Sequence, residues 1–242
     1  MNNEESILLL LTCCVDPKGM SFTKLSDVDL RVRQYYDAFD FYLANTTLKL
    51  LIVENTLFKI DEKYLNNDRI EYLTFDGNNF DKSLGKGYGE ALIIDYALNN
   101  SKFLTLISNP VIVKITGRLK VINIMKILNN RKYNNQKTFI SANVTWKMNF
   151  AYSHFFISSF DVLQEFVLKK KSINDSEGYY FEHLLIRLIK KFNKQYSAFV
   201  GFNSTVEVRG RSGSTGESYK QDGYLAKVNR PIKNLYVKKF LK

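Results

Sequence analysis

Short, uninterrupted runs of apolar residues constrain the fold of this chain more than any other feature of its sequence. They stand at residues 6–15, 48–55, 70–75 and 111–117. Runs of this length are typical of strands that are buried on both faces, as in a parallel sheet. Helical patterns separate them at 26–46, where Ser26 or Asp27 is the expected N-cap, and at 88–101. The alternation of strand and helix predicts βαβ units.

The second half of the chain mixes the two kinds of element. We expect helices at 121–130, 161–170 and 179–192, an antiparallel strand pair at 138–148 and 151–159, and a late strand at 197–202. Of the 242 residues, 45% are hydrophobic and only 3 are proline, which favours one packed domain without long linkers. The predicted fold is a three-layer α/β/α, Rossmann-like domain over residues 1–226 with a mostly parallel central sheet.

The charge of the chain favours partners that carry phosphate. Lys and Arg outnumber Asp and Glu by 35 to 24, which gives a formal net charge of +11. Nucleic acid, nucleotides and anionic membrane surfaces all suit such an excess. The segment 227–242 contributes strongly, because its basic residues interleave with apolar ones and it holds no acid. It is either a contact for an anionic membrane surface or a solvated basic tail.

The cysteines and the first apolar run indicate a reduced, intracellular protein. Cys13 and Cys14 are neighbours, and on a strand they point to opposite faces, so a disulfide between them is disfavoured. No cysteine or histidine spacing offers a zinc site. The run at 6–15 is too short to span a membrane, and acidic residues rather than basic ones precede it. We therefore expect a soluble or peripheral protein.

A polar cluster ends the predicted strand at 111–117. Lys114, Thr116, Gly117 and Arg118 stand where the strand leaves the core, and ligands of open α/β sheets bind at the carboxyl ends of strands. Arg118 suits bidentate binding of a phosphate, and Lys114 would add a point charge. The alternative is a structural ion pair with a strand-end acid such as Glu54.

The segment 85–90 (GKGYGE) is a second candidate for binding an anion. Lys86 and Gly87 precede a predicted helix, whose N-terminus favours negative charge, and glycine lets a ligand approach the backbone closely. The segment matches neither a Walker A loop nor the complete GxGxxG pattern. An ordinary turn is the alternative.

Three further segments carry polar residues suited to a site. Glu54 and Asn55 follow the second strand and suit either a base or ribose, or the cap of the next turn. Arg211 and Ser212 belong to a Gly/Ser-rich loop that could close over a diphosphate or lack order. Glu182 begins a helix and is either a general base for an acceptor hydroxyl or an acid that complements the helix dipole.

Taken in chain order, these segments resemble small bacterial glycosyltransferases of capsule, O-antigen and lipooligosaccharide synthesis, which have a GT-A-like fold. The likeness covers roughly residues 7–220, and its most specific elements are KGYGE and KITGR. In chain order, the segments that carry it are TCCVDP, RVRQYYDAFDFYL, LIVENT, GKGYGEALIIDYAL, VKITGRLKVIN and RGRSGSTGESY.

This resemblance implies transfer of a sugar from a nucleotide-sugar donor to a saccharide or lipid-linked saccharide hydroxyl. The first strands would hold the nucleotide through Thr12, Glu54 and Asn55. GT-A enzymes usually bind a divalent metal through a DxD motif after the fourth strand, but KITGR stands there, and the DVD at 27–29 lies at a helix start near the N-terminus. We therefore expect no metal ligands, and no cofactor, although a divalent metal stays open.

Side-chain cations would take the place of that metal on the diphosphate. They are Lys114 and Arg118, helped by Lys86 or Arg211, with Glu182 as the base of a reaction for which inversion is favoured. The expected location is the cytoplasm, peripherally at the inner face of the cytoplasmic membrane. Two alternatives stay open: a nucleotide-sugar-binding protein without catalysis, and a nucleic-acid-binding protein, which is disfavoured because no familiar binding signature is present.

Overall fold

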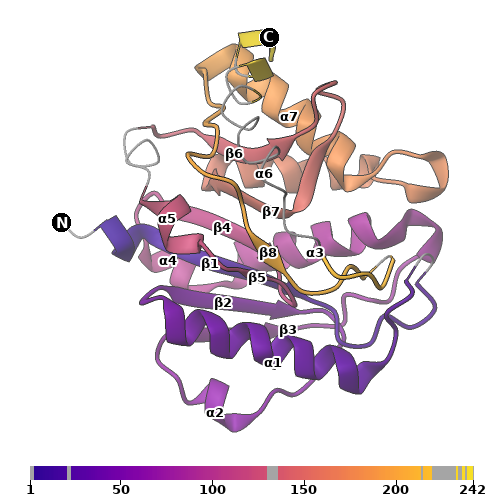
Figure 1. Ribbon diagram of the computed structural model, residues 1–242. Helices are drawn as coiled ribbons and strands as arrows, with labels where there is room; N and C mark the ends of the chain where they lie inside the picture. The colour runs from indigo at the N-terminus through magenta and orange to yellow at the C-terminus, as the bar shows by residue number, and fades with distance from the viewer. Residues whose placement is uncertain are drawn as a thin grey trace.

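A computed structural model describes most of the chain. The described residues are 3–20, 23–129, 136–213 and 215–219, together with 233, 236, 237 and 239–241. Figure 1 shows a central sheet with helices packed on its faces. No helix among these residues is both long and apolar enough to cross a membrane.

The sheet is built from six strands of the described chain, in the order β3-β2-β1-β4-β7-β6. Its strands are β1 (Ile7–Cys13), β2 (Lys49–Glu54), β3 (Ile70–Thr74), β4 (Val111–Thr116), β6 (Ile140–Val144) and β7 (Ala151–Ser159). The first four are parallel to one another, whereas β7 is antiparallel to both β4 and β6. The predicted mostly parallel sheet and the predicted antiparallel pair at its end are confirmed.

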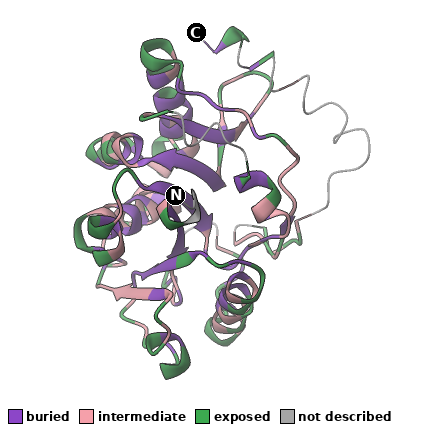
Figure 2. Ribbon diagram, turned by 90° about the vertical axis from the view of Figure 1, so that its left-hand side faces the viewer, coloured by how far each residue is buried: buried purple, intermediate pink, exposed green. Residues whose placement is uncertain are grey.

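Helices cover both faces of this sheet. They are α1 (Val28–Asn45), α2 (Glu62–Leu65), α3 (Gly85–Asn100), α4 (Lys102–Leu106), α5 (Ile124–Leu128), α6 (Phe160–Leu168) and α7 (Phe181–Tyr196). Successive residues of a strand point to opposite faces, so Leu8 and Leu10 pack under α3, α6 and α7 while Leu9 and Leu11 pack under α1 and α5. Figure 2 shows most strands of the sheet as the buried centre of the molecule, while the edge strand β3 is mostly of intermediate burial. The three-layer α/β/α architecture is therefore as predicted.

Two predicted elements are wrong in detail. The helix expected at 121–130 begins only at Ile124, because β5 (Lys120–Val121) first pairs with β8 (Val208–Arg209) in a second, two-stranded sheet. The strand expected at 197–202 is reduced to one bridge between Phe199 and Ile140. This bridge uses the carbonyl of Ala198 and the amide of Val200, while the amide of Phe199 donates to the side-chain oxygen of Asn193 (3.1 Å).

The order of the strands creates one position suited to a ligand. The chain moves outward from β1 to β2 and β3 and then crosses to β4 on the other side of β1. In an open α/β sheet, this reversal leaves a crevice beyond the carboxyl ends of the two central strands. Thr12 near the end of β1 and Thr116 at the end of β4 are register partners there.

The described part of the basic segment 227–242 packs against the domain. Val237 and Leu241 are buried in the core beneath α7, and the side-chain amide of Asn193 donates to the carbonyl of Leu241 (2.8 Å). Phe240 and Lys239 are exposed beside them. Lys233 donates to the side-chain oxygen of Asn143 (3.1 Å), and the ring of Tyr236 lies 5.6 Å from that of Trp146. Residues 227–232, 234, 235, 238 and 242, and the proposed boundary at 226, lie outside the described residues.

Candidate functional site

A buried ion pair lies at the reversal point of the sheet. Lys114 faces the same side of β4 as Ile112, so its side chain enters the layer between the sheet and α3. Its ammonium is completely buried and lies 2.5 Å from Oε1 of Glu90, on the first turns of α3. Nζ also donates to the carbonyl of Ser153 (2.7 Å) and approaches the hydroxyl of Thr116 (3.4 Å). The ion-pair alternative for Lys114 therefore has a partner, but on a helix instead of at the end of β2.

Two hydroxyls complete the shell around the same oxygen of Glu90. Thr12 donates to Oε1 (2.8 Å) and Thr116 lies within 3.3 Å of it, so β1 and β4 both hold this carboxylate. Among the described residues, no hydrogen bond reaches Oε2, and the side chain of Glu90 keeps 19% exposure. One oxygen of Glu90 is therefore fixed by the fold, while the other has no hydrogen-bond partner among the described residues.

A second carboxylate, Glu182, lies on the first turn of α7 in a different environment. The hydroxyl of Ser153 donates to its Oε1 (2.5 Å). Burial raises the pKa of Glu182, the hydrogen bond from Ser153 opposes this rise, and the charge of Glu90 adds to it. Glu90 bonds an ammonium, whereas Glu182 bonds only a neutral hydroxyl through this oxygen. Neighbouring carboxyl groups in unlike environments are typical of sites that divide acid–base roles between them.

The ring of His154 lies near the charges of Lys114 and Glu90. It lies between the rings of Tyr152 and Tyr219, with centroids 5.7 and 5.3 Å away. Burial lowers the pKa of His154 to about 4, and the nearby charge of Lys114 adds to this effect. The imidazole is consequently neutral at pH 7, where it offers shape and a hydrogen bond but no positive charge.

Arg118 is a buried cation on the α1 side of the same edge. Its Nη1 donates to Oε1 of Gln34 (3.1 Å) and to the carbonyl of Arg211 (3.2 Å), and the guanidinium lies 6.0 Å from the ring centroid of Tyr35. No acid within salt-bridge distance is found for it in the described part of the chain. Its Nε is buried without a hydrogen-bond partner among the described residues. An unsatisfied guanidinium of this kind costs free energy unless an anion approaches it.

The Gly/Ser-rich loop predicted to close over the site does reach Arg118. Because β8 pairs with β5, the loop returns to this edge, where Arg211 bridges Ser218 and the amide of Ser212 donates to the carbonyl of Glu217 (2.8 Å). Tyr219 follows, and burial raises its pKa while the charge of Arg118 opposes the rise.

The segment GKGYGE forms the first six residues of α3, so the prediction that Lys86 and Gly87 precede a helix over 88–101 is wrong. The carboxylate of Asp175 accepts hydrogen bonds from the backbone amides of Lys86 and Gly87, which supplies the missing partners of the helix N-terminus. A side chain at Gly87 would meet Phe181, with Cβ 3.0 Å away, which explains this glycine by packing. The anion expected at this helix terminus is thus provided by the chain itself.

Lys86 nevertheless lies close enough to the carboxylates of the candidate site for their charges to affect its pKa. Burial lowers the pKa of Lys86, and the carboxylates of Asp175, Glu182 and Glu90 oppose that shift. Gly117 has a separate reason to be glycine, because a Cβ there would lie 2.6 Å from Sγ of Cys13 and 2.9 Å from the carbonyl of Thr12. The chain can therefore turn from β4 towards Arg118 only through a residue without a side chain.

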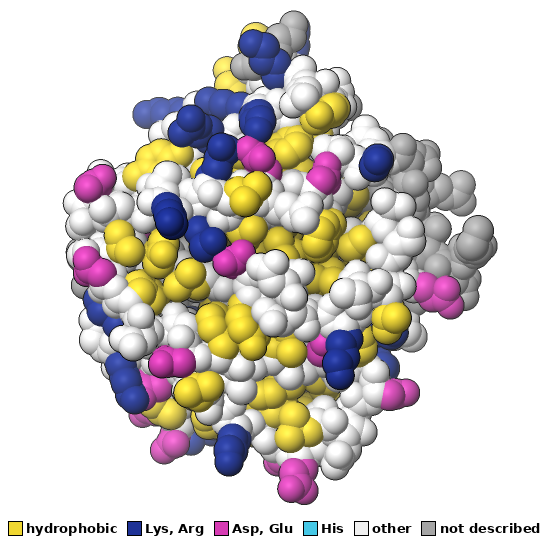
Figure 3. Space-filling model, turned by 180° about the vertical axis from the view of Figure 1, so that it is seen from behind, with side chains coloured by type: hydrophobic (Ala, Val, Ile, Leu, Met, Phe, Trp, Pro, Cys, Tyr) yellow, Lys and Arg dark blue, Asp and Glu magenta, His cyan; other side chains and the backbone are white. Residues whose placement is uncertain are grey.

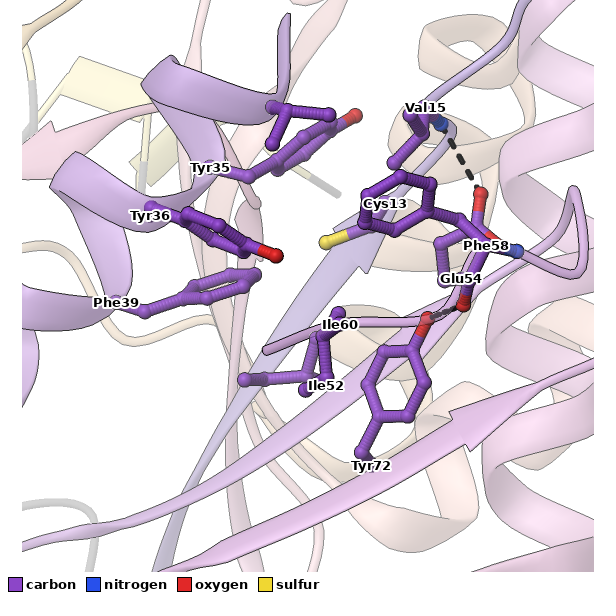
Figure 4. A pocket seen from close by; sticks show the side chains of 11 residues that line it. Cys13, Val15, Tyr35, Tyr36, Phe39, Ile52, Glu54, Phe58, Ile60 and Tyr72 are labelled. Carbon is purple, nitrogen blue, oxygen red and sulfur yellow. Dashed lines mark hydrogen bonds between the residues drawn. The ribbon is translucent and has the colours of Figure 1, made fainter. Parts of the chain in front are cut away.

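Glu54 and Asn55, predicted to bind the nucleotide, are both buried beneath the surface of this edge. The carboxylate of Glu54 accepts hydrogen bonds from the amides of Val15 (3.0 Å), Thr56 (2.8 Å) and Phe58 (3.0 Å), which fixes the loops after β1 and β2. Figure 4 shows the bond to Val15 beside a small cavity. That cavity measures about 10 Å³, room for at most one water. A nucleoside would therefore need a surface other than this cavity.

Several residues of the site were missed by sequence reasoning, and one of them carried a signal. Glu90 falls on the same helical stripe as Ile93, Ile94 and Ala97, which are buried, so its position predicts a carboxylate turned towards the core. Asp175 and Tyr219 carried none, because both stand in polar segments whose approach to the site depends on tertiary structure.

Among the described residues, no group of three or more His, Cys, Asp or Glu side chains is placed to hold a metal ion. The charged groups of the candidate site include the cations Lys86, Lys114 and Arg118 and the carboxylates Glu90 and Glu182.

No protein-family model matches the sequence. No curated protein shows significant sequence similarity to it. Among solved structures, the chain is similar to CTP:phosphocholine cytidylyltransferase from Streptococcus pneumoniae, with a TM-score of 0.39 and 9% identity over 98% of this chain and 100% of that one. A likeness of this strength identifies no activity.

Proposed function

We propose that the protein is a glycosyltransferase that takes a sugar from a nucleotide-sugar donor and transfers it to a saccharide hydroxyl. The observation that carries this proposal is the gathering of buried cations and two unlike carboxylates at the reversal point of the sheet. An anionic leaving group needs the cations, and a hydroxyl that attacks the sugar needs a base.

Arg118 is proposed to bind the diphosphate of the donor. Its guanidinium is oriented by Gln34 and the carbonyl of Arg211, and among the described residues no acid lies within salt-bridge distance to neutralise its charge. Bidentate binding of phosphate is the interaction for which this side chain is best suited. Ser212 and Arg211, on the loop beside it, would approach the same phosphates.

The proposed roles of the two lysines differ. Lys114 is held by Glu90 and the carbonyl of Ser153, so it adds positive potential to the site and positions Glu90 without itself reaching the phosphates. Lys86 stands on the first turn of α3 near Glu182 and Glu90, where its charge would complement the diphosphate. Thr116 and Gly117 shape the turn between Lys114 and Arg118.

Glu182 is proposed as the general base. Its raised pKa makes the carboxylate a better proton acceptor near neutral pH than an ordinary glutamate. It would remove the hydroxyl proton of the acceptor as that oxygen bonds to the anomeric carbon and the bond from this carbon to the phosphate oxygen breaks. The leaving nucleotide carries the negative charge, which the cations stabilise.

The nucleotide would bind over the loops that follow β1 and β2. Thr12 contacts Glu90 through its hydroxyl, and Glu54 holds the backbone of both loops. In this proposal Glu54 builds the binding surface by fixing these loops, and Asn55 supports it through the carbonyl of Gly77 (3.5 Å).

Docking on an anionic membrane, where lipid-linked acceptors are found, is the proposed means of bringing the enzyme to its acceptor. Figure 3 shows Lys and Arg side chains gathering at the end of the molecule where α7 lies. Arg187, Lys190 and Lys194 are exposed on one stripe of that helix. Exposed Tyr196 and Phe240 lie by its C-terminal end. Basic and aromatic side chains together favour an anionic lipid surface.

Two measurements test the proposed reaction. A thermal-shift screen against UDP-, GDP- and CMP-sugars should show selective stabilisation by one nucleotide, because a ligand that binds only the native state raises its stability. Transfer to a saccharide acceptor, or slow hydrolysis of the same donor, should follow. Selective binding without either reaction would indicate a binding protein. Salt-sensitive binding of generic nucleic acid without donor binding would indicate a nucleic-acid-binding protein.

A further inference from the structure

The carboxylate of Glu90 has a geometry that its structural contacts do not account for. Three donors, from Lys114, Thr12 and Thr116, converge on Oε1. An ion pair made only for stability would satisfy both oxygens or bury the carboxylate with its cation. Here the cation is completely buried while Glu90 keeps 19% exposure, and no described residue bonds Oε2. The fold fixes one oxygen and leaves the other for an external donor.

The chemistry of that external donor is limited by the surroundings. A carboxylate oxygen accepts hydrogen bonds and cannot donate them, so it pairs with hydroxyls or cations and repels phosphate. Cations already act on Glu90 from Lys114 and, through its charge, from Lys86 one turn earlier on α3, and His154 beside the site is uncharged at pH 7 because burial lowers its pKa to about 4. Neutral hydroxyl groups are therefore the partners that suit Oε2.

The position of Glu90 favours the hydroxyls of the donor sugar over those of the acceptor. Its two threonine contacts come from β1 and β4, the central strands beyond whose carboxyl ends a ligand is expected. Glu182, the proposed base for the acceptor, contacts Ser153 near the start of β7, one strand further along the sheet. The donor sugar would lie between the proposed phosphate ligand Arg118 and this base.

We propose that Glu90 is a specificity-determining residue that binds hydroxyl groups of the donor sugar through Oε2. Lys114, Thr12 and Thr116 act as positioning residues that hold its carboxylate through Oε1. This inference rests on the proposed glycosyltransferase function, and it concerns the sugar half of the donor alone.

The test separates the contribution of the sugar to binding affinity from that of the nucleotide. Affinities are measured by titration calorimetry for UDP-glucose, UDP-galactose, GDP-mannose and CMP-N-acetylneuraminate, each beside UDP, GDP or CMP. For the wild type, the ratio of the two affinities reports what the sugar contributes. Glu90→Gln replaces one acceptor oxygen by a donating amide, so the sugar contribution should fall by about 10-fold or more while the affinity for the free nucleotide stays unchanged.

A thermodynamic cycle makes the assignment specific. Monodeoxy analogues of the donor that binds most tightly should lose affinity for the wild type where the deleted hydroxyl contacts Glu90. The Glu90→Gln variant, having lost that contact, should bind the deoxy and parent donors with nearly equal affinity. Asp95→Asn is the matched control, since it also replaces a carboxylate by an amide on α3, at a side chain that pairs with Lys170 (3.0 Å).

Folding is controlled separately, because Glu90→Gln leaves the ammonium of Lys114 buried beside a neutral amide. The double variant Glu90→Gln/Lys114→Met removes that charge and should also lack the sugar contribution. If a folded Glu90→Gln keeps the full sugar contribution, or loses free nucleotide and donor equally, the assignment is overturned. A change confined to the KM of the acceptor also overturns it. Failure of the wild type to bind any nucleotide or donor would instead remove the proposed function itself.

Discussion

Because the two members of the Lys114–Glu90 ion pair differ in burial, we predict that removing each one lowers the free energy of unfolding by a different amount. In Glu90→Gln, a completely buried ammonium loses its counter-charge and keeps only neutral partners, the carbonyl of Ser153 and the hydroxyl of Thr116. Breaking a buried pair in this way costs about 3–5 kcal/mol. In Lys114→Met, the remaining carboxylate is 19% exposed and keeps two hydroxyl neighbours. We expect about 1–3 kcal/mol for that change.

Guanidinium denaturation followed by circular dichroism measures this difference. Glu90→Gln should lower the free energy of unfolding by about 2 kcal/mol more than Lys114→Met at pH 7. In a chain of this size each kcal/mol corresponds to about 2–4 °C in Tm, so Tm of Glu90→Gln should lie about 4–8 °C below that of Lys114→Met. The double variant should recover much of the loss, because it buries no unpaired charge.

The same pair predicts a dependence on pH whose direction can be worked out. Burial lowers the pKa of Lys114, and the charge and hydrogen bond of Glu90 oppose that shift. In the Glu90→Gln variant the pKa of Lys114 in the native state falls further. At pH values between this lowered pKa and the ordinary lysine pKa, the unfolded chain therefore binds more protons than the native protein does. Stability then rises with pH in this window. The deficit of Glu90→Gln should shrink as pH rises from about 7 to about 10, below the ordinary lysine pKa of about 10.4. Equal costs for the two variants, or a deficit that grows with pH, would refute this explanation.

Three further predictions concern the reaction and the location of the enzyme. Glu182→Gln should lower kcat by about 10²- to 10⁴-fold with donor affinity unchanged, and a kcat near that of the wild type would exclude Glu182 as the base. Because burial raises the pKa of Glu182, the acidic limb of the wild-type pH–kcat profile should lie above the ordinary glutamate pKa. Treatment with EDTA should leave initial transfer rates unchanged if side-chain cations alone stabilise the diphosphate, whereas loss of activity restored by Mn²⁺ or Mg²⁺ would contradict that role. Reversing the exposed charges of Arg187, Lys190 and Lys194 to Glu should abolish co-sedimentation with phosphatidylglycerol vesicles while donor binding stays intact, and undiminished sedimentation would exclude α7 as the membrane contact.

The architecture of the chain followed from local patterns, because its strands are buried on both faces and therefore read as continuous apolar runs. The N-cap of α1 was also predicted, as Ser26 or Asp27, and it is Asp27 whose carboxylate accepts a hydrogen bond from the amide of Leu30 (2.8 Å). The predictions for short elements were wrong where pairing with a distant segment determines the local structure. Lys120 and Val121 form a strand only because Val208 and Arg209 return to them.

The candidate site was predictable in its chemistry but not in its contacts. A lone lysine in the apolar run of β4 required either an anionic ligand or a carboxylate, and the structure supplies Glu90. The helix N-terminus at Lys86 required an anion, and the structure supplies Asp175. In both cases the residue type indicated what kind of partner was needed. Which partner supplied it depended on segments brought together by the fold.

Calorimetric titration of an Arg118→Met variant with the donor selected by the thermal-shift screen tests the central claim most directly. Arg187→Met, on the exposed face of α7, is the matched control. We predict that the wild type and the control bind the nucleotide-sugar equally, and that Arg118→Met, if its Tm shows it to be folded, binds about 10-fold or more weakly. Equal affinity for all three proteins would contradict a diphosphate site at the junction of β1 and β4.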